Sequence, residues 1–290
     1  MAGWQRWLSP AKLNLGLRII GRRADGYHLL QTLFQLIDLS DVIHLRRRDD
    51  SLIWRVSELP GVEAENDLAI RAARALQRHA GVTIGAEIHV HKRIPMGAGL
   101  GGGSSNAGTV LRALNRIWAV GMSPVELAEL GAELGADVPV FALGRNAVGE
   151  GVGEQLTPVT LPLRQFVVIC APVQVPTAEV FADPRLTRNS LPSTIPRLLS
   201  DECWINDCES AVTARVAEVA GTLAWLRDRG AGWLTGTGAA VYAPVRDAEQ
   251  AQSWLAELPS GWRGWLVSSL DEAPEGTDDT SFTVGTSPSW

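Results

Sequence analysis

The residues best suited to chemistry lie in one glycine-rich stretch, PMGAGLGGGSSNA, at positions 95–107. Alternating apolar and polar residues over 85–93 predict a half-buried strand before it, and apolar residues at helical spacing over 107–118 predict a helix after it. Glycine lets the backbone turn at positive φ and approach a ligand with no Cβ in the way. The N-terminus of the following helix adds unpaired N–H donors and a partial positive charge. The stretch therefore predicts a phosphate-binding loop.

Two better-known phosphate loops fit this stretch less well. A Walker A loop ends in Gly-Lys-Ser/Thr, and here no lysine precedes Ser104. The glycines at 97, 99 and 102 match G-x-G-x-x-G, but a dinucleotide fold expects an acidic residue at a strand end about twenty residues later. At that place Ser123 and Pro124 instead have the pattern of a helix start. The stretch is also too closely framed by periodic segments for a flexible linker.

The composition excludes several classes of protein. The chain of 290 residues has 46% hydrophobic and 20% charged residues, which is typical of a soluble globular protein with room for two domains. A net charge of −6 argues against nucleic-acid binding, which needs a basic face. No stretch is apolar enough to span a membrane, and three cysteines without metal-ligand spacing suit a reducing compartment. We therefore predict a cytoplasmic protein without nucleic-acid or membrane partners.

Three further places carry polar residues of uncertain role. The segment 9–20 alternates as a strand with one apolar face, and Lys12 and Asn14 share the other face, where a lysine is usually solvated. The turn at 24–26 presents Tyr27 and His28, which could clamp a planar group or simply begin a strand. Asp137 lies between two helical segments, where aspartate commonly serves as an N-cap. From the residues alone, these alternatives stay open.

The rest of the pattern predicts an α+β protein with two domains. Strands are expected at 29–39, 41–48, 52–56 and 166–171, at both sides of the turn at 236–238, and at 264–269; helices are expected at 66–79, 124–134, 207–220, 222–229 and 247–258. The prolines in 157–165 suggest a junction, and the helices after it suggest a ferredoxin-like sandwich. We predict an N-terminal domain at 1–162, a C-terminal domain at 163–271, and a mobile polar tail at 272–290.

Together these motifs resemble the GHMP kinase superfamily. Its phosphate loop has the form Pro-x-x-x-Gly-Leu-Gly-x-(Gly)-Ser-Ser, which residues 95–105 match. The stretches SPAKLNLGL, RADGYHLLQTLFQ, LGADVPVF, LTGTGAAVY and NDCE are similar to the branch whose acceptor is a cytidine diphosphate-linked methylerythritol. The likeness covers about residues 7–270. It implies a two-domain fold, with a ribosomal-protein-S5-like N-terminal domain, a ferredoxin-like C-terminal domain and the active site in the cleft between them.

The resemblance implies roles for particular residues. Asp137 would be the catalytic base and Lys12 the active-site lysine, while Asn14 would contact the methylerythritol end of the acceptor. Asp67 departs from the branch pattern, which has Asn followed directly by Leu. The other implied contacts are Lys92 near the adenine; Pro95, Met96, Gly97, Ala98, Gly99, Leu100, Gly101, Gly102, Gly103, Ser104 and Ser105 on the ATP phosphates; and Tyr27, His28, Thr177 and Phe181 around the cytidine.

The implied activity is ATP-dependent phosphorylation of the 2-hydroxyl of the methylerythritol moiety, in non-mevalonate isoprenoid precursor biosynthesis. Mg²⁺ would accompany ATP, with Ser105 as a conceivable ligand and no carboxylate indicated. We predict a monomer or weak homodimer. Two alternatives stand beside this activity: a homoserine- or mevalonate-type kinase of the same superfamily, whose substrate has no base to stack, and a non-catalytic ATP-binding relative, which would be expected to lose Lys12 or Asp137.

Overall fold

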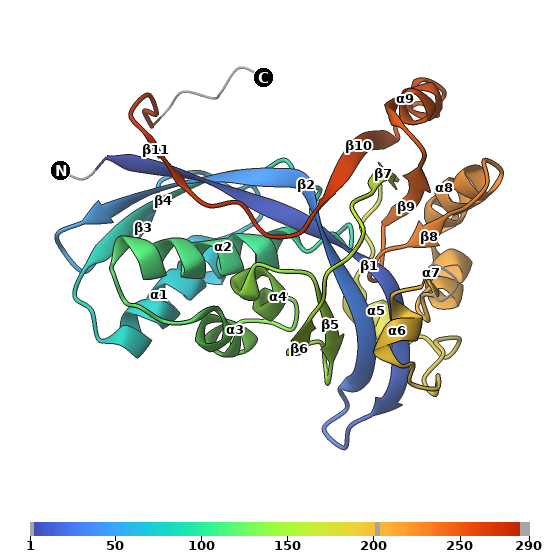
Figure 1. Ribbon diagram of the computed structural model, residues 1–290, viewed down its shortest axis with the longest axis horizontal. Coiled ribbons are helices and arrows are strands. Elements are labelled where there is room, and N and C mark those ends of the chain that lie inside the picture. The colour runs from blue at the N-terminus through green and yellow to red at the C-terminus, as the bar shows by residue number, and fades with distance from the viewer. Residues whose placement is uncertain (1–2, 201–203, 285–290) are drawn as a thin grey trace.

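Two long antiparallel strands run through the whole molecule and organise it. The computed structural model describes residues 3–200 and 204–284. In it, β1 (Trp4–Arg22) and β2 (His28–Arg48) pair along most of their length, joined by the predicted turn at 24–26 (Figure 1). The expected break between 39 and 41 is wrong, because β2 continues through a register shift opposite Pro10. The long strands therefore carry side chains to both halves of the protein.

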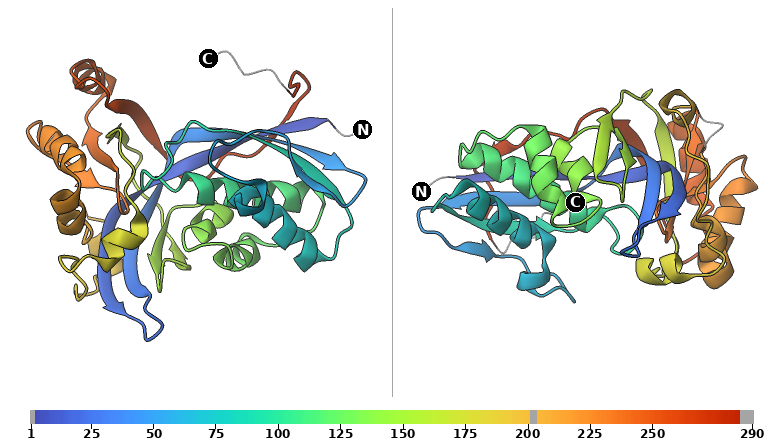
Figure 2. Two further views of the ribbon diagram at one scale, coloured as in Figure 1. Left: turned by 180° about the vertical axis from the view of Figure 1, so that it is seen from behind. Right: turned by 90° about the horizontal axis from the view of Figure 1, so that it is seen from below.

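The first half is a sheet with helices on one face. Figure 2 shows these helices gathered on one side of the long strands. The Ser123 capping box is present: the Ser123 hydroxyl accepts from the Glu126 N–H, and the Glu126 side chain accepts from the Ser123 N–H. The elements are β3 (Ile53–Arg55), the 3₁₀ helix η1 (Ala64–Asn66), α1 (Leu68–Ala80), β4 (Gly85–His91), α2 (Gly102–Ile117), α3 (Pro124–Ala132), α4 (Val138–Leu143), β5 (Ala147–Glu150) and β6 (Gln155–Pro158).

The second half is an antiparallel sheet in the order β10-β7-β9-β8. It joins the first half where β10 pairs with β2 at Ile37. The expected helix break at 220–222 is wrong, since Val216 separates two helices instead. The elements are β7 (Gln165–Cys170), α5 (Thr177–Ala182), α6 (Ile195–Leu198), α7 (Glu209–Arg215), α8 (Ala217–Arg227), β8 (Trp233–Leu234), β9 (Ala240–Val245), α9 (Ala248–Ala256) and β10 (Arg263–Leu270).

One hydrophobic core crosses the predicted domain boundary. Leu13, Ile19 and Leu33 of the long strands pack in the same cluster as Phe166 and Tyr242 of the second sheet. A separate cluster lies between the first sheet and its helices. Because the two parts share this core, the packing does not separate them at 162/163, and the domain boundary stays a prediction. None of the described helices combines the length and the apolarity needed to cross a membrane. Cys170 and Cys208 are buried free thiols, whereas Cys203 lies outside the described residues.

The polar C-terminal segment is not a free tail over residues 272–284. It turns back from β10 across the first half, and β11 (Thr277–Asp279) pairs antiparallel with β1 (Figure 1). The Arg112 guanidinium donates to the Ala273 carbonyl oxygen at 3.0 Å, and the Ala273 N–H donates to the Gly144 carbonyl oxygen at 2.8 Å. The segment therefore has partners from distant parts of the chain, and its predicted mobility stays a prediction. We call residues 271–284 the C-terminal strap; positions 285–290 of the predicted tail lie outside the described residues.

The end of the strap covers two imidazoles of the first sheet. The Phe282 ring stacks on His44 with ring centroids 3.7 Å apart, and it meets His89 edge-on at 5.1 Å. The Asp279 carboxylate lies 3.1 Å from His44 Nε2. Burial lowers the pKa of His44 against the opposing effect of Asp279, with Arg6 and His91 adding to the lowering; burial, His44 and His91 lower the pKa of His89. Both rings are therefore neutral in the fold near pH 7.

We expect the free energy of unfolding to fall as pH falls below about 6.5, the ordinary histidine value. The unfolded chain takes up protons there that the buried imidazoles resist until their lowered pKa values are reached. Denaturant titrations between pH 8 and 5.5 measure this loss. In Phe282→Ala the rings are uncovered, so the loss should be smaller. An equal loss in the two proteins would remove His44 and His89 from this role.

Candidate active site

A cleft of about 1100 Å³ lies where the long strands, the glycine loop and α5 meet. It brings together residues that are far apart in the sequence, from β1 to the turn at 236–238. Of the predicted site residues, Leu100 and Ser105 do not line it. Those that do are Lys12, Asn14, Tyr27, His28, Lys92, Pro95, Met96, Gly97, Ala98, Gly99, Gly101, Gly102, Gly103, Ser104, Asp137, Thr177 and Phe181.

Lys12 is buried at the centre of the cleft wall. It is only 2% exposed. Lys12 is therefore not a solvated strand residue. Its Nζ lies 2.5 Å from Asn14 Oδ1, 2.9 Å from the Gly99 carbonyl oxygen and 3.6 Å from Asp137 Oδ2. Three oxygen partners compensate the ammonium for its lost hydration. The charge is thereby held beside the glycine loop.

Asp137 precedes α4 but does not cap it. The residue stands at the N-cap position, yet its side chain accepts no hydrogen bond from the first turn of the helix. The carboxylate instead faces Lys12, and 38% of the side chain is exposed. The N-cap interpretation is therefore wrong. The arrangement leaves a carboxylate that is oriented by a lysine and open to the cleft.

Asn14 is held by three residues that are distant from it in the sequence. Its Nδ2 donates to Thr32 Oγ1 at 2.9 Å, and its backbone N–H donates to Thr235 Oγ1 at 3.0 Å. The Tyr242 hydroxyl donates to its carbonyl oxygen at 3.1 Å. Thr235 and Tyr242 lie in the LTGTGAAVY stretch and Thr32 lies in the RADGYHLLQTLFQ stretch, but none of the three was singled out as a site residue from the sequence. These bonds turn the Asn14 amide oxygen toward Lys12.

The glycine loop passes between Lys12 and the turn that follows β8. Gly97, Gly99 and Gly101 have φ values of +68°, +74° and +74°, which favour glycine. A Cβ on Gly99 would lie 2.3 Å from the Thr235 carbonyl oxygen, so the approach of the two backbones also requires glycine. The Ala240 N–H donates to the Ala98 carbonyl oxygen at 3.0 Å. The loop is therefore held from both halves of the protein.

The helix after the loop starts earlier than its apolar pattern indicates. α2 begins at Gly102, and the first intrahelical bond runs from the Ser105 N–H to the Gly101 carbonyl oxygen at 2.8 Å. The N–H groups of 102–104 precede that bond and have no intrahelical acceptor. They lie at the lining of the cleft, together with the positive end of the helix dipole. This is the arrangement that binds a phosphate.

Ser105 faces away from the cleft. Its side chain is 0% exposed, and its hydroxyl donates to the Pro10 carbonyl oxygen at 2.6 Å and lies 2.7 Å from Ser9 Oγ. The prediction that Ser105 contacts phosphate or Mg²⁺ is therefore not supported, because its hydroxyl ties α2 to β1. Leu100 is likewise 1% exposed and packs in the core. The alternation within a helical turn sends Ser104 to the cleft and Ser105 inward.

Lys92 lines the cleft and forms an ion pair with the buried Asp41. Its Nζ contacts Asp41 Oδ2 and lies 3.1 Å from Asn106 Oδ1. The other oxygen of Asp41 accepts the N–H groups of Arg93 and Ile94 at 2.7 and 2.9 Å. Neither Asp41 nor Asn106 was named as a site residue from the sequence. Asp41 belongs to no site motif, whereas Asn106 lies in the glycine-rich stretch at 95–107, which could have marked it. They anchor the chain just before the glycine loop.

Asp67, the departure from the family pattern, also lines the cleft. Its carboxylate caps α1 by accepting the Ala69 N–H at 2.9 Å and pairs with Arg55 at 3.2 Å. The side chain is therefore committed to the start of α1.

Aromatic side chains gather at the other end of the cleft. Tyr27 is 65% exposed at the rim, and His28 stacks on Phe181 with ring centroids 5.1 Å apart. The Thr177 hydroxyl lies 3.0 Å from that of Thr237. The pKa of His28 is lowered by burial first, and then by the charges of Arg188 and Arg22. This end offers flat apolar faces to a ring.

Comparisons with known proteins agree with this fold. The family model described as GHMP kinases N terminal domain matches residues 67–145. A homoserine kinase from Cytophaga hutchinsonii shares the fold, with a TM-score of 0.65, 18% identity, and coverage of 96% of this chain and 98% of that one. The architecture and the glycine loop are therefore those of the GHMP kinase fold, and the predicted fold is confirmed.

More similar relatives narrow the family. A 4-diphosphocytidyl-2-C-methyl-D-erythritol kinase from Cupriavidus taiwanensis is 52% identical over 271 residues, covering 92% of this chain and 93% of the relative. One from Burkholderia ambifaria is 48% identical over 276 residues, with coverage of 92% and 94%. A crystal structure of such a kinase matches with a TM-score of 0.79 at 33% identity, covering 91% of this chain and 98% of that one. The chain belongs to the 4-diphosphocytidyl-2-C-methyl-D-erythritol kinase family.

Proposed function

We propose that this protein transfers the γ-phosphoryl group of ATP to the 2-hydroxyl of 4-diphosphocytidyl-2-C-methyl-D-erythritol, giving the 2-phosphate and ADP. The observation that carries the proposal is the pair of Lys12 and Asp137, 3.6 Å apart. The pair lies between a phosphate-type loop and an aromatic pocket that line one cleft. A cleft of this layout suits a nucleoside triphosphate at one end and a base-bearing acceptor at the other.

The residues around the pair divide the work of phosphoryl transfer. Such reactions depend on alignment and charge stabilisation more than on covalent chemistry. The N–H groups at the start of α2 hold the polyphosphate, and Lys12 stabilises the charge that develops between nucleophile and phosphorus. Asp137 accepts the proton of the attacking hydroxyl. Asn14 fixes Lys12 and contacts the polyol of the acceptor.

Magnesium enters this scheme with the nucleotide. Among the residues that the structure describes, no three His, Cys, Asp or Glu side chains converge on one point. Mg²⁺ in phosphoryl-transfer sites is usually bound by substrate phosphates, water and few protein groups, so the donor set fits. We assign Ser104 as the protein oxygen near the ion, because it lines the cleft in the first turn of α2. When bound there, Mg²⁺ would neutralise negative charge on the phosphate groups of the nucleotide.

The aromatic end distinguishes the acceptor from those of related kinases. A nucleobase can stack against the aromatic faces that Tyr27 and the His28–Phe181 pair offer, with a gain of roughly 1–3 kcal/mol per base. Homoserine and mevalonate have no ring to use these faces. The solved homoserine and mevalonate kinases at 15–18% identity share the fold alone. The pocket therefore favours a cytidine-bearing acceptor.

The test is ATP consumption with a panel of alcohols. We expect turnover with the cytidine diphosphate-linked methylerythritol and background rates with free methylerythritol, homoserine and mevalonate. Product phosphorylated at the 2-position, identified by ³¹P NMR, would support the proposal. Comparable rates with homoserine or mevalonate would contradict it, and no turnover with any acceptor would favour the non-catalytic relative.

The remaining features stay proposals of the same kind. We propose that the protein works in the cytoplasm as a monomer or weak homodimer, without nucleic-acid or membrane partners. The net charge of −6 supports the absence of nucleic acid. The division into domains at 1–162 and 163–271 also stays a proposal.

A further inference from the structure

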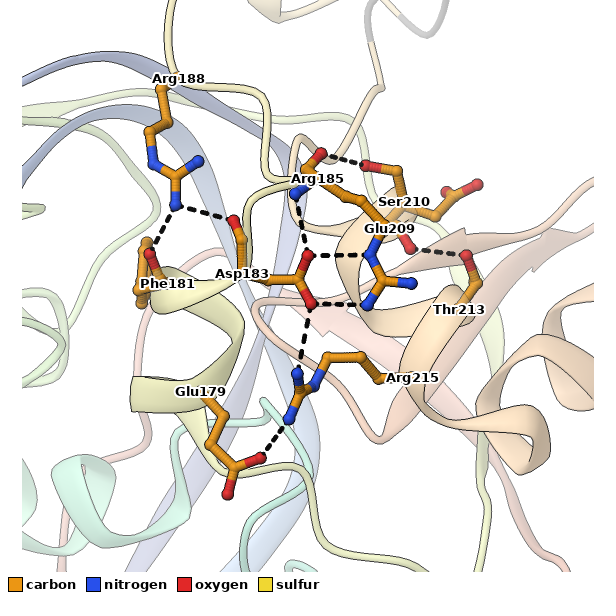
Figure 3. Close-up of polar contacts among 9 residues, drawn as sticks. All are labelled: Glu179, Phe181, Asp183, Arg185, Arg188, Glu209, Ser210, Thr213 and Arg215. Atoms are coloured by element: carbon orange, nitrogen blue, oxygen red, sulfur yellow. Dashed lines mark hydrogen bonds and ion pairs between the residues drawn. The ribbon is translucent and has the colours of Figure 1, made fainter.

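One arginine contacts both residues of the stacked pair in the aromatic pocket, the ring of His28 and the backbone of Phe181. Arg188 lies in the segment after α5, and Figure 3 shows its guanidinium reaching back to the end of that helix. Its Nη2 donates to the carbonyl oxygens of Phe181 and Asp183 at 3.0 and 2.8 Å. Its Nη1 donates to the Leu186 carbonyl oxygen at 3.1 Å, and its Nε donates to His28 Nε2 at 3.2 Å. The same side chain therefore touches both members of the stacked pair.

The partners of Arg188 differ from those of the arginines around it. Arg185 and Arg215 both bind the Asp183 carboxylate, at 2.7 and 3.4 Å, and Arg215 also binds Glu179 at 2.6 Å (Figure 3). In the described part of the chain, the acceptors of Arg188 are three carbonyl oxygens and one ring nitrogen. No carboxylate there neutralises its charge. An electropositive donor is thus aimed at His28.

The bond from Arg188 decides the state of the imidazole. A guanidinium carries only donors and keeps its proton, so His28 Nε2 must accept and the ring proton must lie on Nδ1. Protonation of Nε2 would remove this bond and place two positive groups together. The charged groups near the ring, Arg188 and Arg22, act in the same direction as burial. His28 is therefore neutral, with a defined tautomer and a defined plane against Phe181.

We propose that Arg188 is a positioning residue for the base of the acceptor, holding His28 as a neutral Nδ1–H ring stacked on Phe181. This inference rests on the proposed function, since it assumes that a nucleobase occupies the aromatic end of the cleft. A neutral imidazole offers a flat face and a single ring donor, both of which suit a pyrimidine. Arg188 does not line the cleft and acts through His28.

A purely structural role for Arg188 is the alternative to exclude. The segment after α5 has a second anchor, the buried Asp183 carboxylate. It accepts from Arg185 Nε and from the Arg185 N–H, both at 2.9 Å (Figure 3). These bonds hold the pKa of Asp183 well below its usual range, so the anchor is ionised at every pH of an assay. The segment therefore keeps its attachment when Arg188 is changed. When the Arg185 side chain is changed, the backbone N–H of residue 185 and the Arg215 guanidinium still bind the Asp183 carboxylate.

The experiment compares Arg188→Gln and Arg188→Lys with Arg185→Gln, a matched control in the same segment that does not touch His28. The readouts are the acceptor KM, the ATP KM, kcat, the thermal midpoint and the ¹⁵N–¹H signals of the His28 ring in the ligand-free protein. In Arg188→Gln we expect the acceptor KM to rise roughly tenfold or more at pH 7.5, since a hydrogen bond from a charged donor is lost. The rise should be larger at pH 6, while kcat and the ATP KM stay within about twofold.

In Arg188→Gln the His28 ring signals should change from those of the Nδ1–H tautomer to those of a mixture of the two neutral tautomers. The ring should also become protonated at a higher pH than in the wild type. Arg188→Lys, which retains the charge and loses the fork, should lie between the wild type and Arg188→Gln, and it replaces Arg188→Gln if that variant does not fold. Arg185→Gln should leave the tautomer and the acceptor KM unchanged. An unaltered tautomer in a folded Arg188 variant, or an equal rise of KM in Arg185→Gln, would overturn the proposal. If the proposed function is wrong, the wild-type protein does not phosphorylate the cytidine substrate. The His28 ring signals of the ligand-free protein still test the role of Arg188 in that case.

Discussion

Asp137→Asn should lower kcat by about 10²-fold or more, with little change in the thermal midpoint. The carboxylate is 38% exposed and caps no helix, so the amide can replace it without breaking a bond that the fold needs. The amide cannot accept the proton of the attacking hydroxyl. The KM values of both substrates should change little, because the general base acts in the transition state. Steady-state kinetics with ATP and the cytidine substrate measure the effect.

A second carboxylate in the same cleft serves as the control. Asp25 also lines the cleft, but it pairs with Arg23 at 2.7 Å in the turn before Tyr27 and makes no contact with Lys12. Asp25→Asn should therefore keep kcat within about twofold. If Asp137→Asn also turned over at the wild-type rate, Asp137 would not be the base.

Gly99→Ala should raise the ATP KM at least tenfold and lower the thermal midpoint. The residue has a φ of +74°, and a methyl group would lie 2.3 Å from the Thr235 carbonyl oxygen. The backbone strain alone is of order 1–3 kcal/mol, and the clash forces the loop away from the turn after β8. Since Lys12 Nζ binds the Gly99 carbonyl oxygen at 2.9 Å, the displacement should also lower kcat. Nucleotide titration and steady-state kinetics measure both effects.

Gly81→Ala separates strain from the contact with the site. Gly81 ends α1 with a φ of +63°, and a Cβ there would meet nothing within 4 Å. This variant should lose stability by about 1 kcal/mol through the positive φ alone and bind ATP normally. An ATP KM that rose equally in both variants would show that general destabilisation, and not the loop, is responsible.

Much of the local structure was predictable because its causes lie within a few residues. Positive φ angles at Gly97, Gly99 and Gly101 follow from the glycine loop itself, and the capping box at Ser123 follows from residues three apart. The motifs around the loop also led to the family, which the comparisons confirm. In such places the sequence alone determines the backbone, since sterics and short-range hydrogen bonds suffice.

Burial and partners were decided by the tertiary structure. Lys12 belongs to a strand whose second face could have been solvated, and it is buried because the Gly99 region, 87 residues away, covers it. Asp137 could have been an N-cap, and only the approach of Lys12 gives it another partner. The strap at 271–284 is polar by composition, and it is held by backbone pairing with β1 and by Arg112. Arg188, 160 residues from His28, belongs to the same group.

The glycine loop, the helix after it and the family to which the chain belongs could all be recognised from local sequence patterns. The tertiary structure decided which of the two adjacent serines at 104 and 105 faces the cleft, which lysine is buried and which arginine controls His28. The difference lies in the distance along the sequence over which each interaction acts. Dihedral preferences act between neighbouring residues, whereas desolvation and hydrogen-bond partners depend on segments that meet only when the whole chain has folded.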